Sequence, residues 1–120
     1  MDKIGLTGMT FYGKHGTTRE EKASPQEFIV DIEILKDLQK SGNTDSLDDT
    51  IDYSKVYMIV KSIIEETSFN LIEGISDAIA TKIMDTFDVN KIIIKVTKSN
   101  APMGDNHQNA WVQISREKGS

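Results

Sequence analysis

The sequence predicts an α+β domain in which a four-stranded antiparallel sheet is covered on one face by two helices. Apolar residues alternate with polar ones in segments near both ends of the chain, which is the period of a half-buried strand. Two consecutive segments in the middle place apolar residues three and four apart, the period of an amphipathic helix. No strand-helix-strand crossover demands a parallel sheet, so the order β-β-α-α-β-β fits an antiparallel one.

The first two strands are expected at residues 4–12 and 26–38. The first changes phase at Gly8, which predicts a β-bulge there. In the second, Asp31 and Glu33 alternate with apolar residues, namely Phe28, Val30, Ile32 and Ile34. Residues 13–25 and 40–49 are rich in polar residues and glycine, so each is expected to be a loop.

The first helix is expected to have Asp52 or Ser54 as its N-cap and to end near residue 67. The second helix is expected to run from residue 71 to residue 87. Glu73 is the only acid in the segment between their apolar stripes. We expect its carboxylate to be partly desolvated and therefore to need a partner. It either caps the second helix or accepts two hydrogen bonds from a ligand with adjacent N–H donors.

The third strand carries Ile92, Ile94 and Val96 on one face, and the same period places Lys98 there. A lysine on a buried face is unusual, and the alternative is that it snorkels out of the strand end. Residues 99–109 are expected to form a loop. A fourth strand then directs Ala110, Val112 and Ile114 inward and Trp111 outward. Two bare sheet edges predict edge-to-edge assembly into rings.

Composition limits the possible functions of this chain, which we expect to be one domain over residues 1–120. With no Cys and only two His, we expect catalysis without a metal or other cofactor. The net charge of -5 argues against nucleic acid or an anionic membrane as a partner. The chain has no long apolar run and starts with polar residues, so we expect a soluble, cytoplasmic protein.

Several segments together resemble the dihydroneopterin aldolase family, over almost the whole chain. The matching residues are Gly8-Met9, Phe11-Tyr12-Gly13, His15-Gly16, Glu21, Gln26, Asp49-Thr50-Ile51-Asp52-Tyr53, Asn70-Leu71-Ile72-Glu73, Lys98 and Ala101-Pro102. The resemblance implies a T-fold subunit, assembled as a barrel-shaped homo-tetramer or as an octamer of two stacked rings, with active sites between neighbouring subunits.

The resemblance also implies an activity, a carbon–carbon lyase reaction of folate biosynthesis. The substrate would be a small-molecule pterin, 7,8-dihydroneopterin, cleaved to 6-hydroxymethyl-7,8-dihydropterin and glycolaldehyde, with epimerisation at C2' as a side reaction. No metal or Schiff base would be needed, because the dihydropterin imine itself takes up the electrons of the broken bond.

Site residues follow from the same resemblance. Glu73 would anchor the pterin, with Leu71 and Ile72 beside it, and Ile51 and Tyr53 would complete the substrate-binding set. Lys98 would transfer protons, Glu21 would orient that lysine and a catalytic water, and Tyr53 of the adjacent subunit would move the hydroxyl and enol protons.

Alternatives remain at two of these positions, and two residues depart from the family pattern. Spacing alone allows Glu20 in place of Glu21, and Tyr53 could simply pack. Asp52 and Ser99 stand where the family usually has a neutral or imidazole side chain and a proline. His15, next to glycine, is expected to shape its loop rather than do chemistry.

Two other functions are possible from the sequence. One is epimerisation of dihydroneopterin triphosphate, which would need cations such as Arg19, Lys22 and Lys98. The other is a non-catalytic module that binds a pterin or purine.

Overall fold

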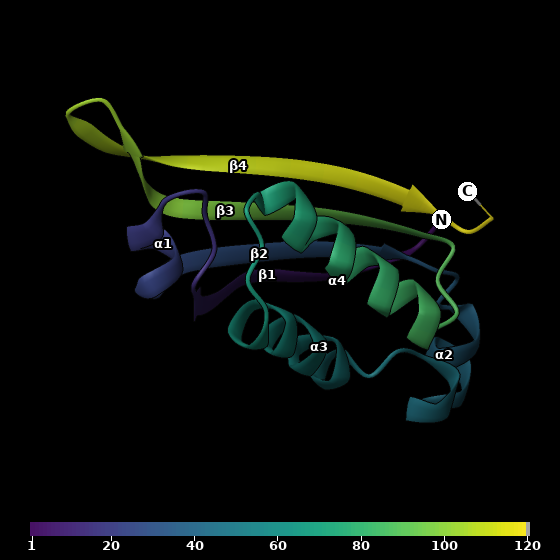
Figure 1. The fold of residues 1–120 in the computed structure, drawn as a ribbon. Helices are drawn as coiled ribbons and strands as arrows, with labels where there is room; N and C mark the ends of the chain where they lie inside the picture. Colours follow the sequence, from purple (N-terminus) through teal and green to yellow (C-terminus); the bar gives the residue numbers. More distant parts are fainter. Residues whose placement is uncertain (120) are drawn as a thin grey trace.

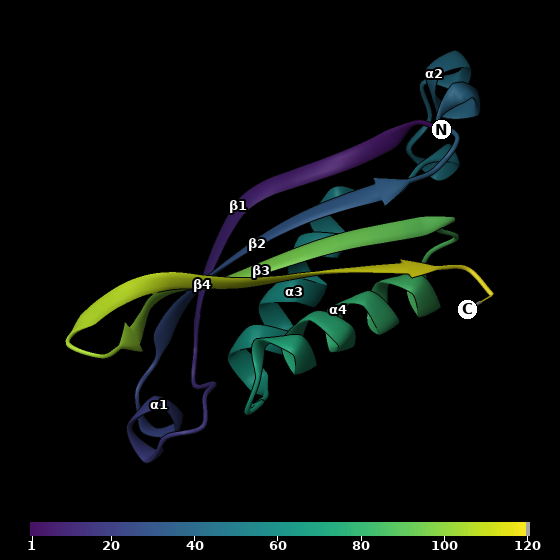
Figure 2. The same ribbon diagram turned by 90° about the horizontal axis from the view of Figure 1, so that it is seen from above.

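The computed structural model describes residues 1–119 and shows a single sheet with its helices on one face (Figure 1). The strands are β1 (Lys3–Gly13), β2 (Gln26–Leu35), β3 (Lys91–Met103) and β4 (Asn106–Glu117), all antiparallel in the order β1-β2-β3-β4. Helix α3 (Tyr53–Glu66) packs against β1, and helix α4 (Ile72–Thr86) packs against β3 and β4. Figure 2 shows both helices on the same side of the sheet. The predicted α+β class, with a four-stranded antiparallel sheet and two helices on one face, is confirmed.

The hydrophobic core lies between this sheet face and the two long helices. The alternating residues of β2 and β3 and the apolar stripes of the helices are fully buried, as the sequence periods predict: Phe28, Val30, Ile32, Ile34, Ile92, Ile94, Val96, Val56, Val60, Ile64, Ile75, Ile79 and Ile83. Helix α3 starts after Asp52, whose carboxylate accepts from the Ser54 backbone N–H at 3.0 Å. Of the two predicted caps, Asp52 is the one used.

Gly8 forms the predicted irregularity in β1. Its φ is 69°, and the register of β1 on β2 shifts between Leu6 and Met9. The freed Gly8 N–H donates to the Asp31 carboxylate at 2.7 Å. The bulge keeps Met9 and Phe11 buried although they are out of phase with Ile4 and Leu6.

Two expected loops contain short helices, so the loop predictions are wrong in part. Helix α1 (Arg19–Ala23) lies in the first, and α2 (Gln39–Thr44) with the 3-10 turn η1 (Leu47–Asp49) lies in the second. In α1 the Thr18 hydroxyl and the Glu21 carboxylate form a capping box. Such local side-chain bonds stabilise one or two helical turns even in polar segments. Strand β2 also ends at Leu35, earlier than residue 38.

The expected loop at 99–109 is instead a hairpin, because β3 and β4 continue to pair through it. Backbone pairs such as Ala101 with Gln108 extend to Met103 and Asn106. The register shifts between Lys98 and Ala101, where Asn100 has a φ of 62°. The polar composition of this segment predicted a loop, but the hydrogen bonds of a strand pair form between backbones and do not require apolar side chains.

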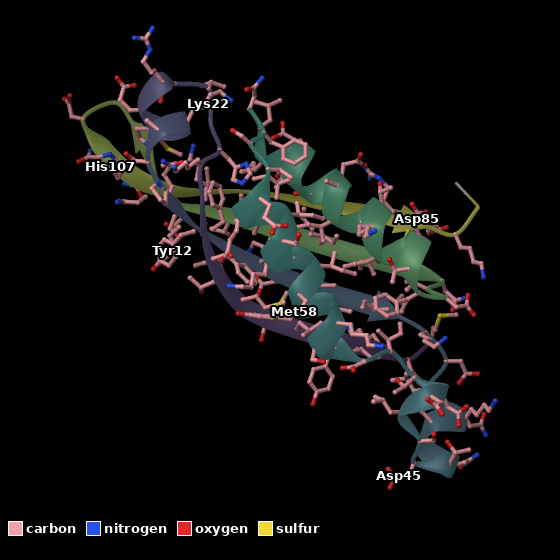
Figure 3. The ribbon with its side chains drawn as sticks, turned by 60° about the horizontal axis from the view of Figure 1, so that its bottom comes forward. Tyr12, Lys22, Asp45, Met58, Asp85 and His107 are labelled. Carbon is pink, nitrogen blue, oxygen red and sulfur yellow. The ribbon has the colours of Figure 1, made fainter. Side chains whose placement is uncertain are left out.

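The molecule is elongated, 53 Å in its longest dimension. Lys22 in α1 and His107 in the hairpin lie toward one end, and Asp45 beside α2 lies at the other (Figure 3). None of the helices within residues 1–119 has the length and apolar character to cross a membrane.

Candidate active site

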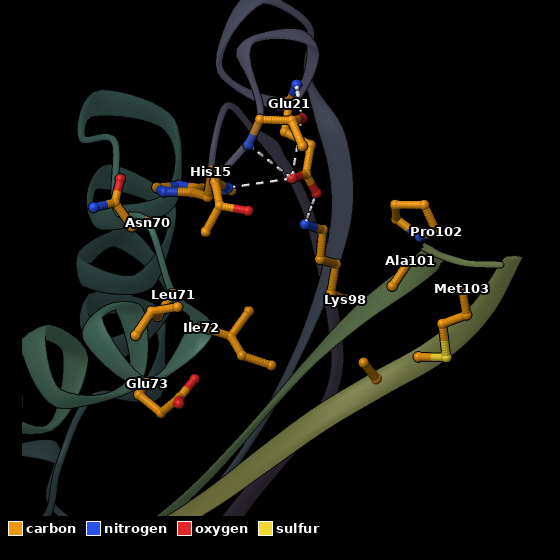
Figure 4. A pocket seen from close by; sticks show the side chains of 14 residues that line it. His15, Glu21, Asn70, Leu71, Ile72, Glu73, Lys98, Ala101, Pro102 and Met103 are labelled. Atoms are coloured by element: carbon orange, nitrogen blue, oxygen red, sulfur yellow. Dashed lines mark hydrogen bonds and ion pairs between the residues drawn. The ribbon is translucent and has the colours of Figure 1, made fainter.

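A cavity of about 430 Å³ opens where the segment after β1, the start of α4 and the kinked part of β3 meet (Figure 4). Small-ligand sites commonly enclose roughly 300–1,000 Å³. Its lining unites five of the seven predicted site residues, Glu21, Leu71, Ile72, Glu73 and Lys98. Within residues 1–119 no group of three or more His, Asp or Glu side chains could hold a metal ion.

Lys98 lies on the helix-facing side of β3, as its phase predicts. It pairs with Phe28 of β2 and Ala110 of β4 in the backbone register. Its ammonium does not snorkel to solvent but forms an ion pair with the Glu21 carboxylate. The two side chains are only 14% and 13% exposed. The lysine is therefore held inside the cavity by one acid.

The other oxygen of Glu21, Oε1, is also occupied. It accepts from the backbone N–H groups of Thr17 at 3.2 Å and Thr18 at 3.3 Å, and from the Thr18 hydroxyl at 3.2 Å. A Cβ on Gly16, whose φ is 152°, would overlap the Glu21 carboxyl. The bond from Lys98, followed by those from Thr18, lowers the pKa of Glu21 against the opposing effect of burial. Glu21 therefore stays ionised at neutral pH, whereas the alternative, Glu20, is exposed and outside the cavity.

Glu73 presents the opposite situation. It lies in the first turn of α4 and is exposed, and within residues 1–119 its carboxylate takes part in no hydrogen bond or ion pair. The expected desolvation is therefore wrong for a single subunit, because the first turn of α4 lies at the cavity mouth and not between the helices. The helix also lacks a side-chain cap, since its N-cap residue is Leu71. Figure 4 shows Glu73 on the α4 wall, across the cavity from Lys98.

Tyr53 and Ile51 do not line this cavity. Tyr53 begins α3, whereas residues 70–73 of the cavity follow the end of that helix. A helix of 14 residues is about 21 Å long. The Tyr53 side chain is 64% exposed. Ile51 is buried in the core, with the whole residue only 4% exposed.

Several other residues that line the cavity were not predicted as site residues from the sequence. They are Thr17, Thr18, Met103 and Ala110, together with Asn70, whose amide oxygen accepts from Lys22 Nζ at 2.6 Å. One signal was present, because Thr18 and Glu21 have the spacing of a capping box before a short helix. Ala110 also gave a signal, because it is expected on the inward face of the fourth strand and pairs with Lys98. Met103 gave none, since it depends on the unpredicted hairpin.

Comparison with known proteins supports the resemblance over the full chain. The model of the family FolB, dihydroneopterin aldolase, matches residues 4–115. The dihydroneopterin aldolase of Bacillus subtilis (strain 168) is 36% identical over 98% of this chain and 99% of its own length. Dihydroneopterin aldolase 1 of Arabidopsis thaliana is 38% identical over 85% of this chain and 70% of its own.

Solved structures share the fold. FolB from Vibrio cholerae superposes with a TM-score of 0.91 at 27% identity, covering 98% of both chains. The E. coli dihydroneopterin aldolase in complex with neopterin gives a TM-score of 0.89 at 24% identity, over 97% of this chain and 99% of that one. Fold, family model and full-length relatives agree, and the chain belongs to the dihydroneopterin aldolase family.

Proposed function

We propose that this chain cleaves 7,8-dihydroneopterin in the cavity between α4 and β3, with Glu73 as the pterin anchor and Lys98 as the proton-transfer group. As a dihydroneopterin aldolase it is a lyase of folate biosynthesis. The observation that carries the residue assignment is the arrangement of the cavity. Glu73, which has no partner among residues 1–119, faces a lysine held by a second carboxylate.

Glu73 fits the edge of a pterin ring. The 2-amino group and N3–H of a pterin lie side by side, and a carboxylate can accept both hydrogen bonds at once. Leu71 and Ile72 line the same wall and bring backbone groups next to the ring. The E. coli structure holds neopterin, and a Burkholderia thailandensis relative with a TM-score of 0.78 at 19% identity, over 98% of this chain and 91% of that one, holds guanine. Guanine presents a similar pair, a ring N–H beside an amino group.

Lys98 and Glu21 lie on the other wall, where the side chain of the substrate would extend. Cleavage begins with removal of the proton from the 2'-hydroxyl, after which C2' becomes the carbonyl of glycolaldehyde and the C1'–C2' bond breaks. Its electron pair moves into the dihydropterin imine to give an enamine, and a proton added at C1' completes 6-hydroxymethyl-7,8-dihydropterin. In this proposal Lys98 carries these protons, and Glu21, which pairs with Lys98, orients a water. A positioned proton-transfer group typically contributes roughly 100- to 10,000-fold in rate.

The remaining two residues enter the proposal through a partner subunit. Strands β1 and β4 are the sheet edges, each paired on one side only, and such edges favour pairing with another chain. A ring of subunits, as a tetramer or a stacked octamer, would bring the exposed Tyr53 and the Ile51 backbone of the partner subunit to the cavity. Tyr53 would then move the hydroxyl and enol protons, and readdition of glycolaldehyde to the other face would epimerise C2'.

Product analysis with Lys98→Ala tests the chemistry. Incubation of the unmodified protein with 7,8-dihydroneopterin should release equal amounts of glycolaldehyde and 6-hydroxymethyl-7,8-dihydropterin, and Lys98→Ala should lower kcat by roughly 100-fold or more. Lys95→Ala is the matched control, because Lys95 lies on the same strand but over the Trp111 ring. Undiminished turnover by Lys98→Ala would refute the assignment.

Mixing two inactive variants tests the shared site. Lys98→Ala and Tyr53→Phe subunits, denatured together and refolded, should regain activity, because some hybrid sites then contain both intact residues. Each variant refolded alone serves as the control. A mixture as inactive as its components would contradict the contribution of Tyr53 by a partner subunit.

A further inference from the structure

His15 is the one titratable side chain that is buried within residues 1–119, at 1% exposure. Its ring lies edge-on to Phe28 with centroids 5.3 Å apart and stacks on Phe69 at 6.1 Å. A Cβ on Gly13 would approach the His15 ring to 2.8 Å, so the imidazole fills the available space. A group this enclosed has a fixed orientation.

Two backbone hydrogen bonds determine which nitrogen carries the proton. The Phe69 N–H donates to Nδ1 at 2.9 Å, and Nε2 lies 2.8 Å from the Ile64 carbonyl oxygen. An N–H can only donate and a carbonyl can only accept, so Nδ1 is unprotonated and Nε2–H donates. Only the neutral imidazole satisfies both partners. Burial lowers the pKa of His15, and the nearby cations Lys22 and Lys98 lower it further, although the bond to Ile64 opposes them.

These bonds join the segment after β1, which leads to Glu21, to the segment between α3 and α4, which leads to Glu73. Ile64 lies in the last turns of α3, and Phe69 directly precedes the stretch from Asn70 to Glu73. On the other side, Gly16 follows His15, and its N–H donates to the Phe69 carbonyl at 3.0 Å. The next two backbone N–H groups, of Thr17 and Thr18, hold the Glu21 carboxylate.

Two other side-chain bonds also cross between these segments, but both are exposed. They run from the Ser68 hydroxyl to the Lys14 carbonyl at 2.7 Å and from Lys22 to Asn70 at 2.6 Å. Exposed bonds compete with water and contribute little, whereas an unsatisfied buried donor is costly. His15 therefore makes the side-chain contact that most strongly fixes one wall relative to the other.

We propose that His15 is a positioning residue that sets the spacing between the pterin anchor Glu73 and the proton-transfer pair of Lys98 and Glu21, through its Nε2-protonated neutral form. The proposal rests on the function proposed above. The bond to Phe69 fixes the Glu73 segment, and the bond to Ile64 fixes the end of α3. His15 touches no reacting atom in this scheme.

Two conservative variants separate the two bonds. In His15→Asn the amide oxygen lies where Nδ1 was and can still accept from the Phe69 N–H. In His15→Gln the amide NH₂ lies where Nε2 was and can still donate to the Ile64 carbonyl. If the Phe69 bond positions Glu73, neopterin should bind to His15→Gln roughly 5- to 100-fold more weakly, because the Phe69 N–H is left unpaired. His15→Asn should bind it within roughly 5-fold of the unmodified protein.

His107→Gln is the matched control, since the second histidine of the chain is exposed in the hairpin and outside the cavity. Thermal melting of all three variants shows whether they are folded. Equal neopterin affinity in folded His15→Asn and His15→Gln would overturn the proposal, as would weaker binding by the Asn variant. A purely structural role would lower both melting temperatures without this ordering of the affinities.

A measurement on the unmodified protein tests the protonation of the His15 ring even if a variant does not fold. The ¹⁵N NMR shifts of the His15 ring should show a protonated Nε2 and an unprotonated Nδ1 at neutral pH, both with and without neopterin. A proton on Nδ1 would overturn the proposal. Neopterin binding is measured directly by fluorescence, so absence of cleavage by the unmodified protein would refute the proposed function while leaving the comparison of the variants valid.

Discussion

The two glutamates of the cavity differ in how their hydrogen-bonding capacity is used. Glu21 is surrounded by donors from Thr17, Thr18 and Lys98, and both of its oxygens are occupied. Glu73, on the facing wall, has no partner within the described residues. A satisfied group holds a fixed geometry, whereas an open acceptor is available to donors on a ligand. Glu21 is thus suited to position a catalytic group, and Glu73 to bind.

Removing the open carboxylate should have the largest effect on binding. Glu73→Gln replaces one acceptor oxygen by a donor, so the pterin edge loses a charge-assisted bond and meets a repelling N–H. We expect neopterin affinity to fall roughly 100-fold or more, with an unchanged melting temperature. Fluorescence titration measures the first and calorimetry the second. Asp77→Asn, on the exposed side of the same helix, is the control. Unaltered affinity in Glu73→Gln would contradict the anchoring role.

Substitution of Glu21, whose two carboxylate oxygens are both occupied, should affect turnover and stability more than binding. Glu21→Gln leaves the partly buried Lys98 ammonium without its charge partner, so kcat should fall by roughly 100-fold while KM changes little. The melting temperature should also fall, because an ion pair is broken inside the cavity. Glu20→Gln changes the neighbouring exposed acid and should leave both quantities unchanged. A loss confined to KM would assign Glu21 to binding instead.

The lowered pKa of Glu21 gives this comparison a pH dependence. Its folded pKa lies below the ordinary value of 4.5, so the unfolded state binds more protons in the interval between them. The stabilisation is therefore complete above 4.5 and disappears as the pH falls through the lowered pKa of Glu21. The free energy of unfolding, measured in urea, should differ between the unmodified protein and Glu21→Gln at neutral pH. The two values should converge at acid pH, and a gap that widens there would contradict this account.

Thr18→Ala should have the smallest effect. It removes one hydroxyl bond to Glu21 and the cap of α1, which typically costs about 0.5–2 kcal/mol, while the Thr17 and Thr18 backbone bonds remain. Kcat should fall only a few-fold, as measured by glycolaldehyde release. Thr18→Ser keeps the hydroxyl and should behave like the unmodified protein. A loss as large as that of Glu21→Gln would mean that the hydroxyl, and not the backbone, positions the carboxylate.

Periodicity predicted the parts of the site that regular structure positions. Lys98 lies inward because it is in phase with Val96 and Ile94, and the antiparallel sheet agrees with the absence of a strand-helix-strand crossover. The exposure of Glu73 was not predictable in this way, because an apolar stripe does not show which residues of the first helical turn face a cavity. The network around Glu21 depends on a turn at Gly16 that is specified by packing.

Other features could not be derived from pattern because they depend on distant contacts. The hairpin that brings Met103 to the cavity is polar, and its pairing is a backbone property. The role of His15 requires Ile64 and Phe69, about 50 residues away, to lie beside it. Tyr53 is separated from the cavity by the length of α3, so the role proposed for it requires a second subunit.

A crystal structure of the protein with bound neopterin tests the central claim most directly. We predict that both Glu73 carboxylate oxygens accept from the 2-amino group and N3–H of the pterin, and that the side-chain hydroxyls of neopterin reach toward Lys98. Neopterin bound elsewhere, for example in the apolar hollow between α3 and α4 lined by Ile59 and Ile63, with Glu73 still facing solvent, would contradict it.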